Sequence, residues 1–525
     1  MSDHGDEKVP IVGPSTCVSY TQTDESSFVI NDPGASSSGG RGRAGTGPYL
    51  TTVREDEELM EVSSEQFSAS GVTGSRHQRA QSSVGSGLRP RTRTMSNRFM
   101  SSVHKIRSYT QQSIHEVPCE DRNNSAFAAG FNVTNLVQGI GIMGVPYAVS
   151  RGSWASIGVI CLVAALCCYT GCLLVDCLYT GCPRTGRRVR YLKSYPDVGA
   201  MVWPRFGRRA VTIVSVVEMF GGMCLYIILL ASTSSSLMKE RVPSLNIYHW
   251  SCISTYATLP LTFITRMSFI SWFSMLAVAS LMSSIVSVLV FCFMHFDQLA
   301  LTNMPGFDPT SFPVSFGIIV FSYCAHAVFP GIEECMRRPN SYPAMLTVSF
   351  GVAAIVKTIM GVMAVLIFGM ATEQEFGRNL EVDADFSFIS NSLIFVNVFF
   401  SMPLVIFVVI ERFDATFLGA FHPTFHRNGS LHWLWILLTR SLIMTAGLFL
   451  SMLVPHFALL MGLVGSFTGT CLCFIFPAWF HLVLKRKQLN AFGVFVRVCI
   501  ILFGALSGAV GMFFSALELK KKLIQ

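Results

Sequence analysis

The sequence predicts an all-helical polytopic membrane protein with about eleven transmembrane helices and a long disordered N-terminal tail. Hydrophobic residues make up 51% of the 525 residues, charged residues only 13%, and the mean hydropathy is +0.49. Apolar stretches of membrane length follow one another from residue 126 almost to the C-terminus. Soluble proteins do not combine this composition with such long apolar runs.

Residues 1–120 form a tail that is rich in Ser, Gly, Thr and Arg and poor in large apolar side chains. Because this composition cannot build a core, we expect a disordered cytoplasmic tail, followed by a transmembrane domain over residues 121–525. Residues 55–60 (EDEELM) resemble an acidic dileucine-type sorting signal, and residues 91–96 (RTRTMS) resemble a basic-directed phosphorylation site. The first pattern predicts sorting adaptors as partners of the tail; the alternative is a solvated charged run.

The apolar spans that follow the tail are each long enough to cross a lipid bilayer. They cover about residues 126–150, 153–179, 209–238, 248–265, 269–294, 312–334, 343–371, 386–411, 431–453, 456–484 and 491–517.

Loop charge predicts the orientation of these spans, since Lys and Arg gather in cytoplasmic loops. With the tail inside, about sixteen Lys and Arg lie in cytoplasmic loops, and only Arg151, Lys239, Arg241 and Arg378 lie opposite. We therefore expect a cytoplasmic N-terminus and a luminal or outer C-terminus, although the lysines at 520–522 break the rule.

The net charge of +8 comes from the tail and the short loops, without a basic stripe interleaved with aromatic residues. Nucleic acid is therefore not a predicted partner, whereas the lipid bilayer is. No metal or cofactor is predicted. The apolar spans contain no nucleotide-binding loop, no His-Glu-x-x-His pattern and no serine nucleophile elbow, which argues against an enzyme.

Two of the spans are interrupted by glycine and proline, at residues 139–146 (GIGIMGVP) and 322–331 (SYCAHAVFPG). In hydrocarbon every backbone amide needs a partner, so a broken helix survives only where its freed groups line an enclosed cavity or hold a ligand. Broken helices at matching places in two halves are typical of transporters. The alternative is a pair of ordinary kinked helices.

The two breaks lie in the first and the sixth span, so each begins a block of five. This spacing predicts a five-plus-five inverted repeat, with one repeat over about 126–294, the other over about 312–484, and an extra helix at 491–517. The first span would start inside and the sixth outside, which gives the blocks opposite orientations.

The breaks also predict a site for a zwitterion. Glycines permit close backbone approach, the half-helix that starts near Pro146 offers free N–H groups to a carboxylate, and the carbonyls near Ser322 suit an ammonium group. A small amino acid meets both requirements. The candidate substrate-binding residues are Gly139, Gly141, Gly144, Tyr147, Ser322, Tyr323, His326 and Phe329.

Ionisable residues inside the spans are costly and so are candidates for ion coupling. Glu218 is the predicted proton carrier, with a structural hydrogen bond as the alternative. Lys357 is predicted to be a fixed positive charge in place of sodium, or to pair with Glu218, or to form a structural salt bridge. His326 would titrate in a useful range but is also a typical packing residue.

Two further sets of polar residues have predicted roles. Asn132 and Asn135, one turn before the first break, are expected to support unwound backbone or an ion site. Glu333 and Glu334 are expected to close a gate with Arg337, Arg338 or the loop after the eighth span.

Five strings of the sequence resemble the amino acid/auxin permease family. They are residues 129–139 (AGFNVTNLVQG), 144–148 (GVPYA), 167–171 (CCYTG), 316–323 (FGIIVFSY) and 454–462 (VPHFALLMG). The resemblance runs from about 127 to 513 and implies a leucine-transporter-like core of eleven helices. In particular it resembles vesicular members, which implies exchange of GABA or glycine for protons at acidic cytoplasmic vesicles, such as synaptic vesicles.

The family also carries an acid at the position of Glu218, whereas residues 324–331 depart from its hydroxyl- and amide-bearing stretch, so the group that faces the substrate would differ. Two other functions stay open. One is a sodium- or proton-coupled symporter of the plasma or lysosomal membrane. The other is a sensor that binds an amino acid without transporting it.

Overall fold

The computed structural model describes residues 122, 124–181, 188–263, 267–417 and 431–524. The predictions for the tail, including the sorting and phosphorylation patterns at residues 55–60 and 91–96, lie outside the described residues.

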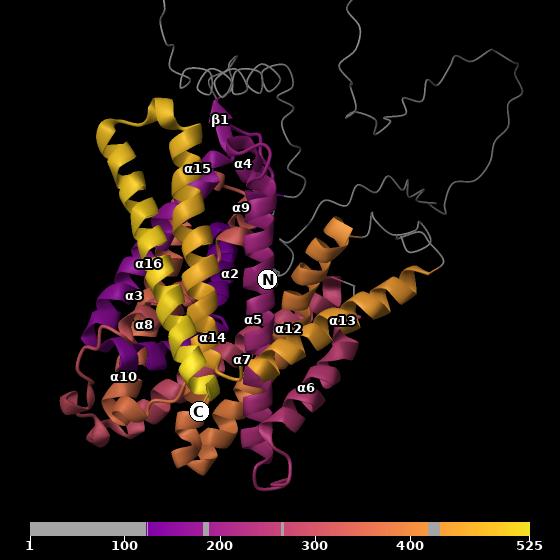
Figure 1. Cartoon of the computed structure of the whole chain (residues 1–525), viewed down its shortest axis with the longest axis vertical. Coiled ribbons are helices and arrows are strands. Elements are labelled where there is room, and N and C mark those ends of the chain that lie inside the picture. Colours follow the sequence, from indigo (N-terminus) through magenta and orange to yellow (C-terminus); the bar gives the residue numbers. More distant parts are fainter. Residues whose placement is uncertain (1–121, 123, 182–187, 264–266, 418–430, 525) are drawn as a thin grey trace, which may run out of the picture. The chain divides into compact units, whose positions relative to one another are not determined.

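The described part of the chain is almost entirely helical, which confirms the predicted fold class (Figure 1). The main helices are α2 (Ala126–Gln138), α3 (Val145–Cys177), α4 (Tyr195–Val202), α5 (Gly207–Met238), α6 (Ile247–Thr262), α7 (Met267–Met294), α8 (Phe312–Tyr323), α9 (Phe329–Glu334), α10 (Tyr342–Phe368), α11 (Phe376–Asn379), α12 (Ala384–Phe417), α13 (His432–Leu453), α14 (Phe457–Val464), α15 (Phe476–Leu484) and α16 (Ala491–Ile524). A hairpin of β1 (Tyr179–Gly181) and β2 (Arg188–Arg190) pairs Thr180 with Val189.

Nine segments of the described chain are long and apolar enough to cross a membrane. The first, Ala126–Cys177, is 52 residues long and bends at Ser153, where φ is 56°; this is the predicted boundary between the first two spans. Helix α6, with 16 residues, is shorter than the roughly 17–25 residues that a membrane-spanning helix needs. The total of eleven spans and the inverted repeat remain predictions.

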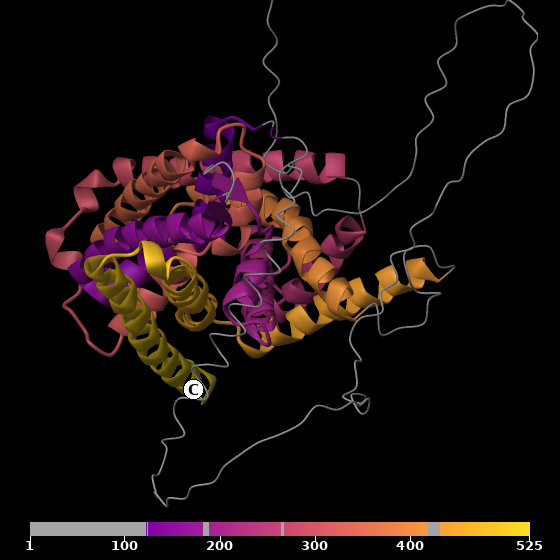
Figure 2. The ribbon, with the colours of Figure 1, turned by 90° about the horizontal axis from the view of Figure 1, so that it is seen from above.

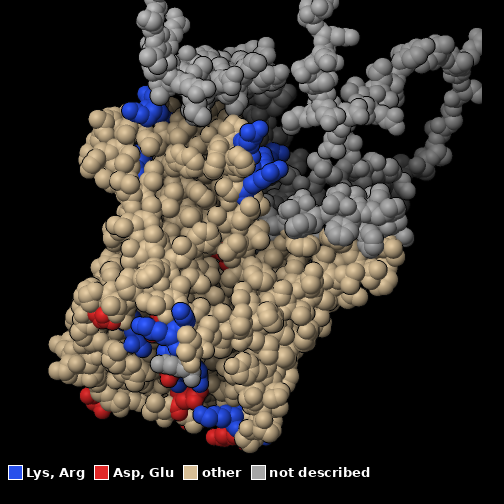
Figure 3. Space-filling model, viewed as in Figure 1, with Lys and Arg blue, Asp and Glu red and all other residues tan. Residues whose placement is uncertain are grey.

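The surface of the helical unit matches a membrane environment. Large apolar side chains face outward along its sides, among them Trp154, Phe293, Val348, Leu442 and Leu506. Figure 3 shows Lys and Arg gathered at the two ends of this unit, with a wide uncharged belt between them. Since exposed apolar groups are stable only in lipid or against protein, this belt is the expected bilayer contact.

Helix α5 has a central place among the helices. It packs against α4, α6, α12, α13 and α14. A second group of contacts joins α3 to α8 and α10, and α2 to α10. Seen along the bundle, α5 lies near the middle and α16 at the edge (Figure 2).

Both predicted breaks are present. Helix α2 ends at Gln138, a 3₁₀ turn covers Ile140–Gly144, and α3 restarts at Val145 with Pro146 in its first turn. Helix α8 ends at Tyr323, a 3₁₀ turn covers His326–Val328, and α9 restarts at Phe329 with Pro330 in its first turn. Proline suits both restarts because the first turn of a helix has no partner for its N–H groups.

A third irregular segment, which the sequence analysis did not predict, lies between α14 and α15. Residues Gly465–Ile475 form a π-helical segment that packs against α8 and α16. Helix α8 approaches this segment backbone to backbone: a Cβ at Gly465 would lie 2.1 Å from the carbonyl oxygen of Gly317. Extended π-helix is rare and is often found at functional sites.

Replacing Gly465 by Ala is therefore expected to destabilise the bundle by about 1–3 kcal/mol, since the new methyl group meets rigid backbone. The thermal unfolding midpoint in detergent measures the effect. Gly351→Ala in α10 is the matched control, because a Cβ there has no atom within 4 Å, and alanine favours a helix. An equal midpoint for both variants would contradict the close packing of α8 on the π-helical segment.

Candidate functional site

Lys357 of α10 joins the two broken helices. Its Nζ donates to the carbonyl oxygen of Val137 at 2.9 Å, to the hydroxyl of Ser322 at 3.0 Å, and to the carbonyl of Ser322. The Ser322 hydroxyl is free to accept because it donates its own proton to the carbonyl of Ile319 at 2.8 Å. Three acceptors match the three donors of an ammonium group. The side chain is fully buried, so these bonds replace its water shell.

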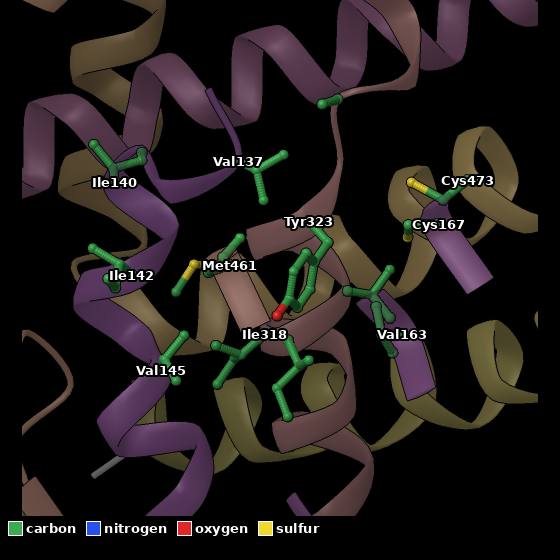
Figure 4. Close-up of a cluster of buried hydrophobic side chains, with 14 of the residues drawn as sticks. Val137, Ile140, Ile142, Val145, Val163, Cys167, Ile318, Tyr323, Met461 and Cys473 are labelled. Atoms are coloured by element: carbon green, nitrogen blue, oxygen red, sulfur yellow. The ribbon is translucent and has the colours of Figure 1, made fainter. Parts of the chain in front are cut away.

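The two breaks also touch each other directly. A Cβ at Gly141 would lie 2.7 Å from the Cα of Ser322, so only glycine permits this approach. The ring of Tyr323 lies under the Lys357 ammonium, with the nitrogen 3.9 Å from the ring centroid, and stacks on Phe350. In Figure 4 the Tyr323 ring occupies the middle of a cluster of apolar side chains that includes Ile318 and Met461.

Glu218 lies in the middle of α5 and is 4% exposed. Its carboxyl group is hydrogen-bonded to the thiol of Cys324, which follows α8 at the second break. No ion pair joins Glu218 to Lys357 among the described residues, so the ammonium is held by carbonyl and hydroxyl groups rather than by a carboxylate.

His326 is fully buried in the second break and faces α3. Its Nε2 lies 3.0 Å from the hydroxyl of Thr170, and its ring contacts Phe329 with centroids 4.8 Å apart. Thr170 itself donates to the carbonyl of Leu166 at 2.8 Å. This environment is that of a histidine that packs α9 against α3.

The other candidates from the sequence lie around the same two breaks. Gly139 precedes the 3₁₀ turn of the first break and Gly144 is its last residue, and Gly144 faces Met461. Tyr147 lies one turn later under the Arg151 guanidinium.

Phe329 is fully buried against Tyr342 and Phe350. Asn132 and Asn135 are half-buried, and the Asn135 carbonyl accepts from the N–H of Gly139 at 2.9 Å.

Sequence reasoning missed the partner of the acids that follow the second break. Arg190 of β2, rather than Arg337 or Arg338, pairs with Glu333 and Glu334, each at 3.3 Å. Glu333 also accepts from the Tyr179 hydroxyl of β1. Arg190 and Glu333 are both buried. Nothing in the local sequence signals this ion pair, because it depends on the hairpin folding over α9.

Arg190 also donates to three backbone carbonyls. Two belong to Leu192 and Lys193, just after β2, and the third to Pro330 of α9, at 3.1, 2.9 and 3.0 Å. The start of α2 reaches the same region, since the N–H of Asn124 donates to the carbonyl of Cys335 at 3.0 Å. At this end of the bundle the hairpin is therefore bonded to the second broken helix, and the start of the first broken helix is bonded directly to the end of the second.

At the opposite end of the bundle, the segment between α10 and α12 is hydrogen-bonded to neighbouring helices. Glu375 is buried and hydrogen-bonded to Ser232 of α5, and the side-chain oxygen of Gln374 accepts from the N–H of Ala458 at 3.1 Å. Glu381 accepts from Ser236 of α5 at 2.8 Å. These bonds connect the segment to α5 and to the start of α14.

Burial raises the pKa of Glu375 from 4.5 to about 7, although the Ser232 hydrogen bond and the charge of Arg378 lower the pKa; the charge of Glu373 adds to the rise. A carboxyl group with a raised folded-state pKa stabilises the fold fully below pH 4.5 and loses this contribution as pH rises through about 7. At about 1.4 kcal/mol per pH unit, the effect is on the order of 3 kcal/mol.

We therefore expect the unfolding midpoint to fall between pH 5 and pH 8, and Glu375→Gln to remove much of that fall. Burial lowers the pKa of His456, and its contribution is lost as pH falls, the opposite sign; since it is present in both proteins, it cancels in their difference. An identical pH profile for the variant would rule out Glu375 as the titrating group.

The fold and the site define a class: a polytopic membrane protein of the transport type, with two broken helices joined inside the bundle by a buried ammonium group. The family described as transmembrane amino acid transporter protein matches residues 122–517. The chain belongs to this family, and it is a transport protein rather than an enzyme.

Two relatives have similar sequences over most of the membrane domain. The vesicular inhibitory amino acid transporter of Xenopus tropicalis is 32% identical over 68% of this chain and 70% of the relative. The vesicular GABA transporter of Caenorhabditis elegans is 31% identical over 68% of this chain and 72% of the relative. The resemblance to the amino acid/auxin permease family is thereby confirmed.

Among solved structures, MHP1, a nucleobase-cation-symport-1 family transporter in a closed conformation with bromovinylhydantoin bound, has a TM-score of 0.46 and 14% identity. The match covers 77% of this chain and 93% of that chain.

Proposed function

We propose that this protein exchanges small neutral amino acids, such as GABA or glycine, for luminal protons across the membrane of acidic vesicles. The two broken helices would open alternately toward the cytoplasm and the lumen. The names of the relatives support the substrate class and the vesicle. In this proposal the hairpin and the N-terminus are cytoplasmic, the C-terminus is luminal, the vesicles are synaptic, and sorting adaptors bind the tail.

The observation that carries the proton coupling is the ammonium of Lys357 between the two breaks. It contacts the carbonyls of Val137 and Ser322, which are the hard oxygen ligands that a coupling sodium ion would otherwise use. With a resident positive charge at that position, a second cation would be repelled. Coupling then requires a group that can be neutral or charged, and the candidate is Glu218, which is buried in the middle of α5 and hydrogen-bonded to Cys324 at the second break.

In the proposed cycle, protonated Glu218 returns from the luminal side with its charge neutralised, which lowers the cost of moving it through the low-dielectric interior. Release of the proton to the cytosol leaves a carboxylate next to Cys324 at the second break. The substrate carboxylate would lie at the start of α3, where the N-terminal end of the helix dipole carries a partial positive charge. The N–H of Val145 itself donates to the carbonyl of Ile142.

Uptake of labelled GABA, glycine and a panel of other amino acids into proteoliposomes tests this proposal. An inside-acidic, inside-positive gradient should drive accumulation in the wild type without sodium. Glu218→Gln should abolish gradient-driven accumulation, because the amide cannot bind and release a proton. The matched control is Glu518→Gln, a partly exposed acid of α16, which should behave as the wild type.

The other outcomes identify the rival functions. Uptake that requires sodium would contradict the proposal and establish a symporter. Saturable binding without flux under any gradient would indicate an amino acid sensor.

A further inference from the structure

Three thiol groups meet beside the second break. The Cys473 thiol, from the π-helical segment, donates to the sulfur of Cys324 at 3.1 Å and is also hydrogen-bonded to Cys167 of α3. Cys324 in turn is hydrogen-bonded to the carboxyl group of Glu218. Figure 4 shows Cys167 and Cys473 to one side of Tyr323. These thiols come from three separate segments of the chain, and the proton-coupling proposal assigns them no role.

The Cys324–Cys473 pair is suited to forming a covalent bond. A disulfide has sulfur atoms about 2.05 Å apart, so the two sulfurs need to approach each other by only about 1 Å. Cys324 is the residue after the end of α8, with extended backbone (φ −75°, ψ 108°), and is therefore not held in a helical turn. Cys324 is also half-buried, whereas Cys473 and Cys167 are fully buried. A small reagent would meet Cys324 first.

We propose that Cys324 and Cys473 are a modification site, at which a two-electron oxidant such as hydrogen peroxide forms a disulfide that ties the second broken helix to the π-helical segment. The consequence for activity rests on the proposed function. If alternating access requires the second break to move against the π-helical segment, the disulfide stops the cycle until it is reduced.

The chemistry balances in two steps. The Cys324 sulfur attacks a peroxide oxygen, the O–O bond breaks, and Cys324 becomes a sulfenic acid while one water leaves. The Cys473 sulfur then attacks the Cys324 sulfur, the S–O bond breaks, and a second water leaves with the Cys473 proton. Overall, two thiols are oxidised by two electrons and one peroxide is reduced to two waters. The Glu218 carboxylate is placed to accept the Cys324 proton as the thiolate forms and to return it to the departing hydroxide, which leaves as the first water.

The bond itself is tested first, without any measurement of transport. The full-length protein in liposomes is treated with hydrogen peroxide, free thiols are blocked, and the digest is mapped by mass spectrometry. We expect a cross-linked peptide that joins residues 324 and 473, absent after treatment with dithiothreitol. Oxidation of the exposed Cys499 reports that the reagent has acted. A 167–473 cross-link, or no cross-link while Cys499 is oxidised, would overturn the proposal.

The effect on function is tested next. Peroxide should abolish uptake by the wild type, and dithiothreitol should restore it. Cys473→Ala should retain uptake after peroxide, whereas the matched control Cys499→Ala should be inhibited as the wild type is. Cys473→Ser serves as a second variant if Ala destabilises the bundle. Equal inhibition of the wild type and the Cys473 variants would refute the proposal that the disulfide stops transport. If untreated wild type transports nothing, the proposed function fails, and the peptide map still decides whether the bond forms.

Discussion

Replacing Lys357 by Met is expected to abolish uptake and to lower the unfolding midpoint strongly. The variant fills much of the same volume but removes the donor that satisfies the carbonyls of Val137 and Ser322. Each buried carbonyl left without a partner costs about 1–3 kcal/mol, and bonds to a charged donor are the stronger kind. The destabilisation expected is therefore about 2–6 kcal/mol. Thermal unfolding in detergent and gradient-driven uptake in proteoliposomes measure the two effects.

The matched control is Lys239→Met, since Lys239 forms an ion pair whose lysine side chain is 73% exposed. Exposed ion pairs contribute about 0–1 kcal/mol, so this variant should unfold and transport like the wild type. If the Lys357→Met variant were as stable and active as the wild type, the two breaks would not need the ammonium group. A stable but inactive variant would separate a role in coupling from a role in holding the breaks together.

Replacing Arg190 by Met is expected to destabilise the hairpin end by about 3–5 kcal/mol, because it leaves the buried Glu333 without its cation. The second change Glu333→Gln removes the unpaired charge, so the double variant should recover much of the lost stability. A double-mutant cycle on the unfolding free energy measures this coupling. Additive effects of the two changes would show that the ion pair contributes nothing.

Arg188→Met provides the control for this cycle. Arg188 lies in the same strand and pairs with Asp176 at 2.7 Å, but both side chains are partly exposed. Loss of this exposed pair is expected to cost about 0–1 kcal/mol. Opening of the hairpin can be followed separately by hydrogen exchange of β1 and β2, which should rise in Arg190→Met and remain low in Arg188→Met.

The helices and both breaks were predictable because they follow from local sequence. The predicted span at residues 312–334 coincides with α8 through α9, and that at 209–238 starts within two residues of α5. Apolar runs in hydrocarbon leave the backbone no alternative to helix. The breaks at Gly139 and Ser322 were visible because glycine and proline mark the points where helical bonding stops.

The hairpin and the π-helical segment were not predictable in this way. The short strands β1 and β2 pair with each other across residues 182–187, in what reads from sequence as a basic loop. The π-helical segment Gly465–Ile475 has the same apolar composition as its α-helical flanks. The segment is in backbone contact with Gly317 of α8. A contact between two helices leaves no pattern in the sequence of either helix.

The sequence by itself determined that this protein spans a membrane, where its helices break, and that Glu218 and Lys357 lie in apolar spans, because each of these properties depends on a short run of residues and on the solvent around it. Only the tertiary structure decided which groups the buried charges pair with. Lys357 bonds to carbonyls 220 and 35 residues away, and Arg190 rather than Arg337 or Arg338 neutralises Glu333. Such pairs form only when distant helices pack together, and each buried charge then takes the partner that the packing brings within bonding distance.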